Sequence, residues 1–188
     1  KLFIAALFAL APLSVEAANR FAVCVTACTW DASDTTMWST TSGGATGASV
    51  PGSSDAVILD AATCVGGVTC TVTVNTTVAV ISITMGACTA STTGCILDFS
   101  ANDNNVTLST QFSCTGTGTR TVNLGDGTWT LSSAAGTVWD LTTITNLTFN
   151  ANASSIVVSA TPTSQRTFGS GAVTYNNITF TNPGTVNV

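Results

Sequence analysis

The chain has 188 residues, a formal net charge of −5 and no histidine, and only 7% of its residues are charged. Its four lysines and arginines stand against nine acidic residues, which excludes a basic face for DNA or RNA, because such a face must neutralise a run of phosphates. The lack of histidine also excludes imidazole-based catalysis, imidazole metal ligands and a histidine pH switch.

The residue types that dominate the chain favour strands and tight turns. Hydrophobic residues make up 45% of it, which is enough for one core in a domain of this size. Threonine, valine and isoleucine favour strands, glycine, asparagine and serine favour turns, and the strong helix formers are scarce. We therefore predict an all-β domain.

The N-terminal segment is typical of a secretory leader. One cation, Lys1, precedes an apolar run over 2–13, which is too short to span a bilayer, since that takes about 20 residues. Val15 and Ala17 are small residues at the positions that matter for cleavage, so we predict a signal peptide over 1–18, cut after Ala17 or Ala18. A retained anchor or a buried N-terminal helix is the alternative. A cleaved leader predicts a secreted protein, extracellular or at the cell surface.

The segment over 19–60 is predicted to be an N-terminal cap. It contains Trp30 and Trp38, a glycine pair at 43–44 and the sequence from Pro51 to Asp55. We expect the two tryptophans to cover the open end of the fold, because an uncapped sheet end exposes core. Residues 61–188 are predicted to form β-helix repeats that stop within a coil at the C-terminus.

Six of the seven cysteines form three close pairs along the sequence. The candidate disulfides are Cys24 with Cys28, Cys64 with Cys70, and Cys88 with Cys95. Local disulfides that close loops are the simplest pairing, although spacing alone leaves other connectivities open. Cys114 is left over, either free and buried or available for a bond between chains. A zinc site is the functional alternative, but these spacings without histidine match no common zinc motif, so we expect neither metal nor cofactor.

A short motif recurs after the cap: a β-branched or leucine residue, one polar residue and a larger apolar residue. It occurs at 83–85, 97–99, 122–124, 147–149 and 178–180, and turn-forming residues follow it. The last three intervals are about 25, 25 and 31 residues, within the range of solenoid repeats. A second strand follows each turn, at 106–108, 129–131, 156–158 and 186–188.

This period predicts a single-stack parallel β-helix, or β-solenoid, in which the chain returns one strand spacing further along its axis. The inward residues are expected to form one core stack, and these are Met85, Phe99, Leu124, Phe149 and Phe180. A β-sandwich is the main alternative, because many short strands with turn signals fit it too. We prefer the solenoid, since a sandwich does not require one motif at nearly constant spacing.

From Trp30 through Trp38, the glycine pair and the Pro51–Asp55 stretch, the chain resembles the opening module of secreted bacterial and phage-associated parallel β-helix proteins. These include autotransporter-like surface proteins and fibres. The strings ending at Phe149 and Phe180 look like the coils that follow this module. The cysteines depart from the pattern of many relatives. The resemblance implies a structural or adhesive role, with no active site to carry over.

We expect no enzyme. Paired catalytic carboxylates must lie within about 5 to 10 Å on one surface, whereas Asp55 and Asp60 are predicted to face opposite sides of a strand. Arg120 and Arg166 are expected to be solvated. The predicted function is a structural or adhesive segment of a surface protein, filament or phage appendage, with its own downstream sequence or other copies of itself as partners. The alternative is a threonine-rich module that binds ice or a polysaccharide surface.

Overall fold

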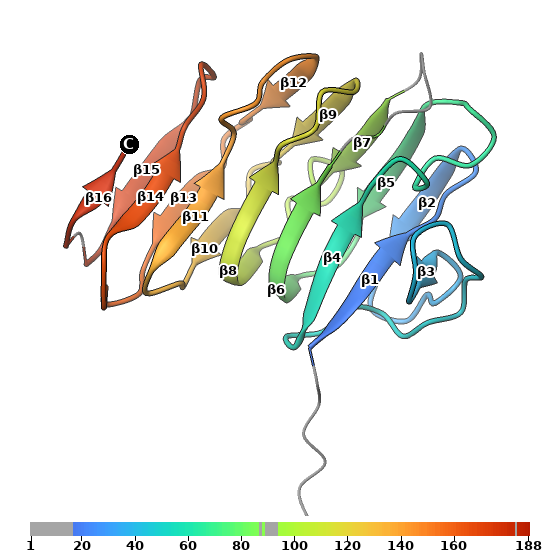
Figure 1. Cartoon of the computed structure of the whole chain (residues 1–188), viewed down its shortest axis with the longest axis horizontal. Coiled ribbons are helices and arrows are strands. Elements are labelled where there is room, and N and C mark those ends of the chain that lie inside the picture. The colour runs from blue at the N-terminus through green and yellow to red at the C-terminus, as the bar shows by residue number, and fades with distance from the viewer. Residues whose placement is uncertain (1–16, 87, 89–93, 183) are drawn as a thin grey trace, which may run out of the picture.

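In a computed structural model, the described residues of the chain (17–86, 88, 94–182 and 184–188) contain strands and turns and no helix (Figure 1). The predicted signal peptide lies almost wholly outside these residues, as does most of the loop between Cys88 and Cys95. Figure 1 shows the strands following one another along the longest axis, from β1 and β3 at one end to β16 at the other.

The strands form two sheets. The eleven-stranded sheet contains β1 (Ala18–Ala22), β3 (Trp38–Ser39), β4 (Asp55–Leu59), β6 (Val78–Met85), β8 (Val106–Cys114), β10 (Thr128–Leu131), β11 (Gly136–Asp140), β13 (Ser155–Val158), β14 (Arg166–Gly169), β15 (Asn177–Phe180) and β16 (Val186–Asn187). The five-stranded sheet contains β2 (Ala27–Trp30), β5 (Cys70–Val74), β7 (Cys95–Asp98), β9 (Arg120–Asn123) and β12 (Leu147–Asn150).

From β4 to β10 the chain alternates between the two sheets. After that, β12 lies in the five-stranded sheet, and β11, β13 and β14 lie in the eleven-stranded sheet. From β4 onward, the paired strands of each sheet are parallel. This is a β-solenoid of about four turns. The predicted all-β solenoid is therefore confirmed, and the β-sandwich is not, because sandwich sheets are built from antiparallel strands.

The predicted period is confirmed in the five-stranded sheet. Successive partners along one column are Cys70, Cys95, Arg120 and Leu147, at intervals of 25, 25 and 27 residues. The last predicted repeat does not continue this column. Ile178 pairs with Ile156 in the eleven-stranded sheet, so the motif at 178–180 is equivalent to the second strand of the preceding coils.

The two sheets enclose one core because strand side chains alternate between its inside and outside. Along β4 and β5, buried residues alternate strictly with half-buried ones, as a strand with one covered face requires. The interior of the middle coils is aromatic. Trp139 is in register with Phe112 and Phe168, and its ring stacks on that of Phe168 with centroids 5.7 Å apart. Trp129 packs edge-on against Phe99 at 4.7 Å.

The single core stack predicted from the motif is wrong, because its five members belong to two sheets. Met85 lies in β6 opposite Leu59, and Phe180 lies in β15 opposite Val158. Both pairs are in the eleven-stranded sheet. All five predicted residues pack in or against the same core, but they do not share a column.

The other three members of that stack lie along the five-stranded sheet, in two columns. Phe149 is in register with Val122, whereas Leu124 follows its strand and donates its backbone N–H to the Asn150 carbonyl at 3.0 Å. Phe99 follows β7 in the same way and donates to the Asn123 carbonyl at 3.0 Å. The motif leaves this register open, because a shift of two residues preserves the alternation of inward and outward side chains.

The N-terminal end is closed by a short antiparallel strand. β3 pairs with β1, with Phe21 opposite Ser39 and Ala22 opposite Trp38. Trp30 and Trp38 are both buried, and their rings meet edge to face with centroids 5.0 Å apart. The two rings thus pack together at the end of the solenoid where the sequence predicts the cap.

Candidate functional site

Three cysteine pairs lie at disulfide distance, and they are the pairs expected from the spacing. The Cα–Cα separations are 5.7 Å for Cys24–Cys28, 5.4 Å for Cys64–Cys70 and 5.7 Å for Cys88–Cys95, within the usual range for disulfides. Cys70 is in register with Cys95, and Cys24 forms an isolated parallel bridge with Cys64. The three pairs therefore follow one corner of the solenoid, which we call the cysteine corner.

The cysteine corner continues with an arginine in place of a cysteine. Cys114 is buried and free, and Arg120 is in register with Cys95 on one side and Leu147 on the other. The Arg120 Nη1 donates to the Cys114 sulfur at 3.5 Å. Cys114 and Arg120 are six residues apart, as Cys64 and Cys70 are, so Arg120 occupies the sequence position that the second cysteine holds in an earlier coil.

The Arg120 side chain also joins two coils through backbone carbonyls. Its Nε donates to the Gly118 carbonyl at 3.0 Å, and its Nη2 donates to those of Thr143 and Thr145 at 3.2 and 2.9 Å. The expectation that Arg120 is solvated is wrong, since its relative exposure is 0%. Backbone oxygens at the corner satisfy the buried guanidinium, as a buried charge requires.

The thiol of Cys114 is held in its neutral form. Burial raises the pKa of Cys114 to about 11, against the opposing effect of the nearby Arg120 charge. Because the thiolate is the nucleophilic form of cysteine, the Cys114 thiol is a poor nucleophile at neutral pH.

Arg166 is buried as well, which corrects the second expectation of a solvated arginine. It lies in β14, in register with Gly136 and Val186. Its Nη1 donates to the Ala160 carbonyl at 2.9 Å, and its Nη2 donates to the carbonyl of Asn182. Arg166 therefore links successive turns at a second corner.

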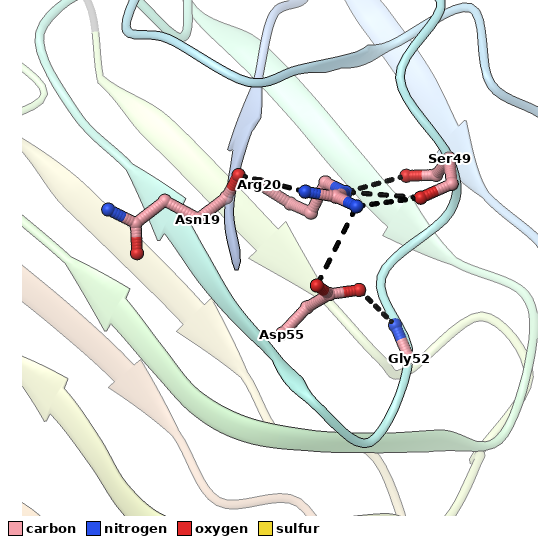
Figure 2. A network of polar contacts seen from close by, with 5 residues as sticks. All are labelled: Asn19, Arg20, Ser49, Gly52 and Asp55. Atoms are coloured by element: carbon pink, nitrogen blue, oxygen red, sulfur yellow. Dashed lines mark hydrogen bonds and ion pairs between the residues drawn. The ribbon is translucent and has the colours of Figure 1, made fainter. Parts of the chain in front are cut away.

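A polar network fastens the loop of the cap onto β1 and β4, which are neighbours in the eleven-stranded sheet (Figure 2). The Arg20 guanidinium donates to the Ser49 hydroxyl at 2.8 Å and lies 3.6 Å from the Asp55 carboxylate. The other Asp55 oxygen accepts the Gly52 backbone N–H at 2.9 Å. Arg20 in β1 and Asp55 in β4 thus hold this loop at Ser49 and Gly52.

The turns that lead from the five-stranded sheet to the eleven-stranded sheet carry a ladder of acidic and amide side chains. Asp103 Oδ1 accepts the Asp126 N–H at 2.8 Å, and Asp126 Oδ1 accepts the Ala153 N–H at 2.9 Å. The backbone is left-handed at Asp103 and at Asn152, with φ of 50° and 51°, as asparagine and aspartate tolerate. These carboxylates bind the turn of the next coil.

The outer face of the five-stranded sheet carries no continuous row of threonines. One outward column runs Thr73, Asp98, Asn123 and Asn150. Asp98 accepts hydrogen bonds from the backbone and hydroxyl of Ser100 at 2.9 and 2.6 Å, and the Asn150 amide donates to Asn123 Oδ1 at 2.7 Å. Thr73 is therefore the one threonine of this column.

An open groove of about 470 Å³ lies beside β12 at the C-terminal end of the solenoid. It is lined by residues 149–152 and 174–176, among which Phe149 and Tyr175 are aromatic and Asn150, Asn152, Thr174 and Asn176 are polar. The Phe149 and Tyr175 rings are 5.3 Å apart. The sequence motif singled out Phe149 for the core only. Nothing in the repeat pattern marked Tyr175, because it lies between two strands.

Within the described ranges, no three histidine, cysteine, aspartate or glutamate side chains are grouped so that they would hold a metal ion. The same part of the chain has no helix of the length and apolarity needed to cross a membrane.

The fold and its ladders of inter-coil contacts define the chain as a β-solenoid. Comparison with family models, with curated proteins and with solved structures finds no match for it.

Proposed function

We propose that the chain is a structural or adhesive β-solenoid segment of a secreted surface protein, filament or phage appendage. The observation that carries this proposal is the continuity of contacts between coils. Strands pair in register in both sheets, and side chains at the cysteine corner and at the Asp103–Asp126 turns bond to the following coil. Such a rod suits a passive, non-catalytic role without a cofactor.

The proposed location is outside the cytoplasm. Three cysteine pairs at disulfide distance suit an oxidising compartment, and the leader-like segment over 1–18 agrees with secretion. We place the protein in the extracellular space or at a cell surface on these two grounds.

The proposed partners are further coils of the protein's own downstream sequence or other copies of itself. β15 and β16 each pair on one side within the described residues. Edge strands of soluble proteins are commonly protected by charged side chains or proline, and these two strands carry neither. Beyond Asp140 the sequence contains a single charged residue, the buried Arg166. This end is therefore suited to strand addition.

A threonine-rich surface that binds ice or an extended polysaccharide face receives less support. Such a surface needs the same side chain at the same height on successive coils. The column of Thr73, Asp98 and Asn123 breaks that requirement in the five-stranded sheet. In the other sheet, Val157 lies between Thr130 and Thr179.

Association through the last coil is testable with a charge placed on its edge. Thr179→Lys adds a cation to β15, and Thr107→Lys adds the same cation in the same outward column three coils earlier. We expect concentration-dependent association of the wild type in sedimentation velocity and elongated particles in electron microscopy. Thr179→Lys should weaken association and Thr107→Lys should not. A wild type that stays monomeric at all concentrations contradicts the assembling role.

A further inference from the structure

We propose that the groove beside β12 is a binding site for a neutral saccharide. The inference deepens the adhesive side of the proposed function and rests on it. It is carried by three observations: the groove lies where the repeat would place a strand of the five-stranded sheet, two aromatic rings form part of it, and its polar lining is uncharged.

The groove exists because the five-stranded sheet lacks a strand where the repeat would supply one. β14 ends at Gly169 and β15 begins at Asn177, so the chain passes the position next to β12 over 170–176 without pairing there. The left-handed Gly171, with φ of 61°, turns the chain at the start of this segment. The open edge of β12 is thus left beside a cavity that is large enough for a small ligand.

The Tyr175 ring in the groove is held by two hydrogen bonds. The Tyr175 hydroxyl donates to the Ser170 carbonyl at 2.7 Å and accepts the Trp139 indole N–H at 3.0 Å. Burial raises the pKa of Tyr175 to about 12, so the phenol stays neutral and keeps both bonds. Tyr175 and Phe149 remain half-buried, which leaves part of each ring open to the groove. Aromatic rings that line a groove offer apolar faces to a ligand, and the C–H face of a sugar ring is an apolar surface that matches them.

The polar lining supplies neutral hydrogen-bonding groups. Three asparagines and one threonine line the groove, and none of its lining residues carries a charge. Two of the amides are held in place: Asn176 donates to the Ser154 carbonyl at 3.1 Å, and Asn150 donates to Asn123 at 2.7 Å. Amides and a hydroxyl match the hydroxyl groups of a neutral sugar. The groove has no cation for a phosphate or a uronic acid, and no carboxylate for a cationic ligand.

The chain offers a site-specific probe, because Tyr175 is its one tyrosine. Protein labelled with 13C-tyrosine therefore gives ring signals from the groove alone. We expect these signals to shift during titration with at least one of cellohexaose, maltohexaose and N-acetylchitohexaose, and to stay unchanged with an oligogalacturonate. Unchanged signals with all three neutral sugars at millimolar concentration overturn the proposal.

Two variants separate the groove from binding elsewhere. Asn152→Gly removes a lining amide while keeping the left-handed backbone, and Asn146→Gly makes the same change at another exposed left-handed asparagine outside the groove. We expect Asn152→Gly to weaken binding about tenfold, equivalent to the loss of about 1.4 kcal/mol, and Asn146→Gly to leave it unchanged. Equal affinity in both variants overturns the assignment to this groove.

An extended peptide is the competing occupant, because β12 also offers an open strand edge. A neutral hexapeptide of alternating threonine and valine serves as the probe for it. Tyrosine shifts with this peptide and none with the sugars overturn the saccharide proposal. Sedimentation and unfolding measurements on the same samples test the structural role separately. A groove that binds no sugar therefore contradicts the saccharide proposal and not the structural role.

Discussion

The guanidinium of Arg120 lies against the thiol of Cys114, with 3.5 Å between Nη1 and Sγ. On the two preceding coils the same corner carries the pairs Cys64–Cys70 and Cys88–Cys95. The covalent closure of the earlier coils is replaced here by a set of hydrogen bonds from a single cation. Those bonds also reach the following coil, which a disulfide within one coil does not do.

Arg120→Ala should strongly destabilise the protein. The substitution leaves the carbonyls of Thr143 and Thr145 without their donor and opens a cavity at a fully buried site. We expect a loss of about 3 kcal/mol in the free energy of unfolding. Arg120→Met keeps most of the volume and should lose less. Denaturant unfolding monitored by tryptophan fluorescence measures both, and an alanine variant as stable as the wild type contradicts the role given to Arg120.

The protein should lose stability between pH 9 and pH 11. The pKa of Cys114 rises from 9.0 to about 11 on folding, so the unfolded chain releases this proton first. The stability that the neutral Cys114 thiol contributes is fully present below pH 9. It is lost as the pH rises through the pKa of the folded state, and the free energy of unfolding falls by about 2 to 3 kcal/mol in total. Cys114→Ala should flatten the pH dependence of the unfolding free energy in this window. An identical slope in both proteins contradicts the prediction.

One cysteine should be open to alkylation without reduction, and only after unfolding. Cys114 is buried and free, whereas the other six form three pairs at disulfide distance. We expect iodoacetamide to leave the native protein unmodified, to label Cys114 once in denaturant and to label all seven cysteines after reduction. Intact mass and peptide mapping read the result. A label on any other cysteine before reduction contradicts the pairing.

Gly125→Ala should destabilise the protein more than Gly66→Ala. Both glycines have left-handed backbones, with φ of 69° and 87°, so alanine is strained at either position. A Cβ at Gly125 would also lie 2.7 Å from the Phe99 carbonyl oxygen on the preceding coil, whereas Gly66 has open space around it. We expect about 1 kcal/mol for Gly66→Ala and at least twice that for Gly125→Ala. Chemical unfolding compares the two, and equal losses contradict close packing of the coils at this turn.

The sequence predicts the solenoid and its period well, because both depend on features that a chain repeats. Leu97 and Val122 are in register as the motif requires, and the second strands align Val106 with Trp129. The local cysteine pairs could also be predicted, because the two members of each pair lie close along the chain.

The core stack could not be derived from the same pattern. A strand alternates with a period of two, so the motif at 147–149 fits its neighbours equally well after a shift of two residues. Phe149 therefore faces Val122, whereas Leu124 lies past its strand. Which sheet receives a motif depends on the lengths of the preceding turns. For this reason Ile178 joined the eleven-stranded sheet.

The burial of Arg120 and Arg166 was not predicted, because a charged side chain in a sequence is expected at the surface unless a partner for it can be identified. One signal was available for Arg120: its distance from Cys114 equals the six-residue spacing of Cys64 and Cys70. For Arg166 the partners are backbone carbonyls of Ala160 and Asn182, which no side-chain pattern reveals. The groove was missed for a similar reason, since it arises where a strand fails to form.

The parallel register of successive coils also governs how the molecule can change in evolution. Each coil in the middle of the stack meets only the one before it and the one after it, so duplication or deletion of a unit of about 25 residues alters the length of the rod by one strand spacing, about 4.8 Å, and leaves its cross-section intact. Length is therefore a property that gene duplication can adjust in discrete steps, without a new fold at any intermediate stage.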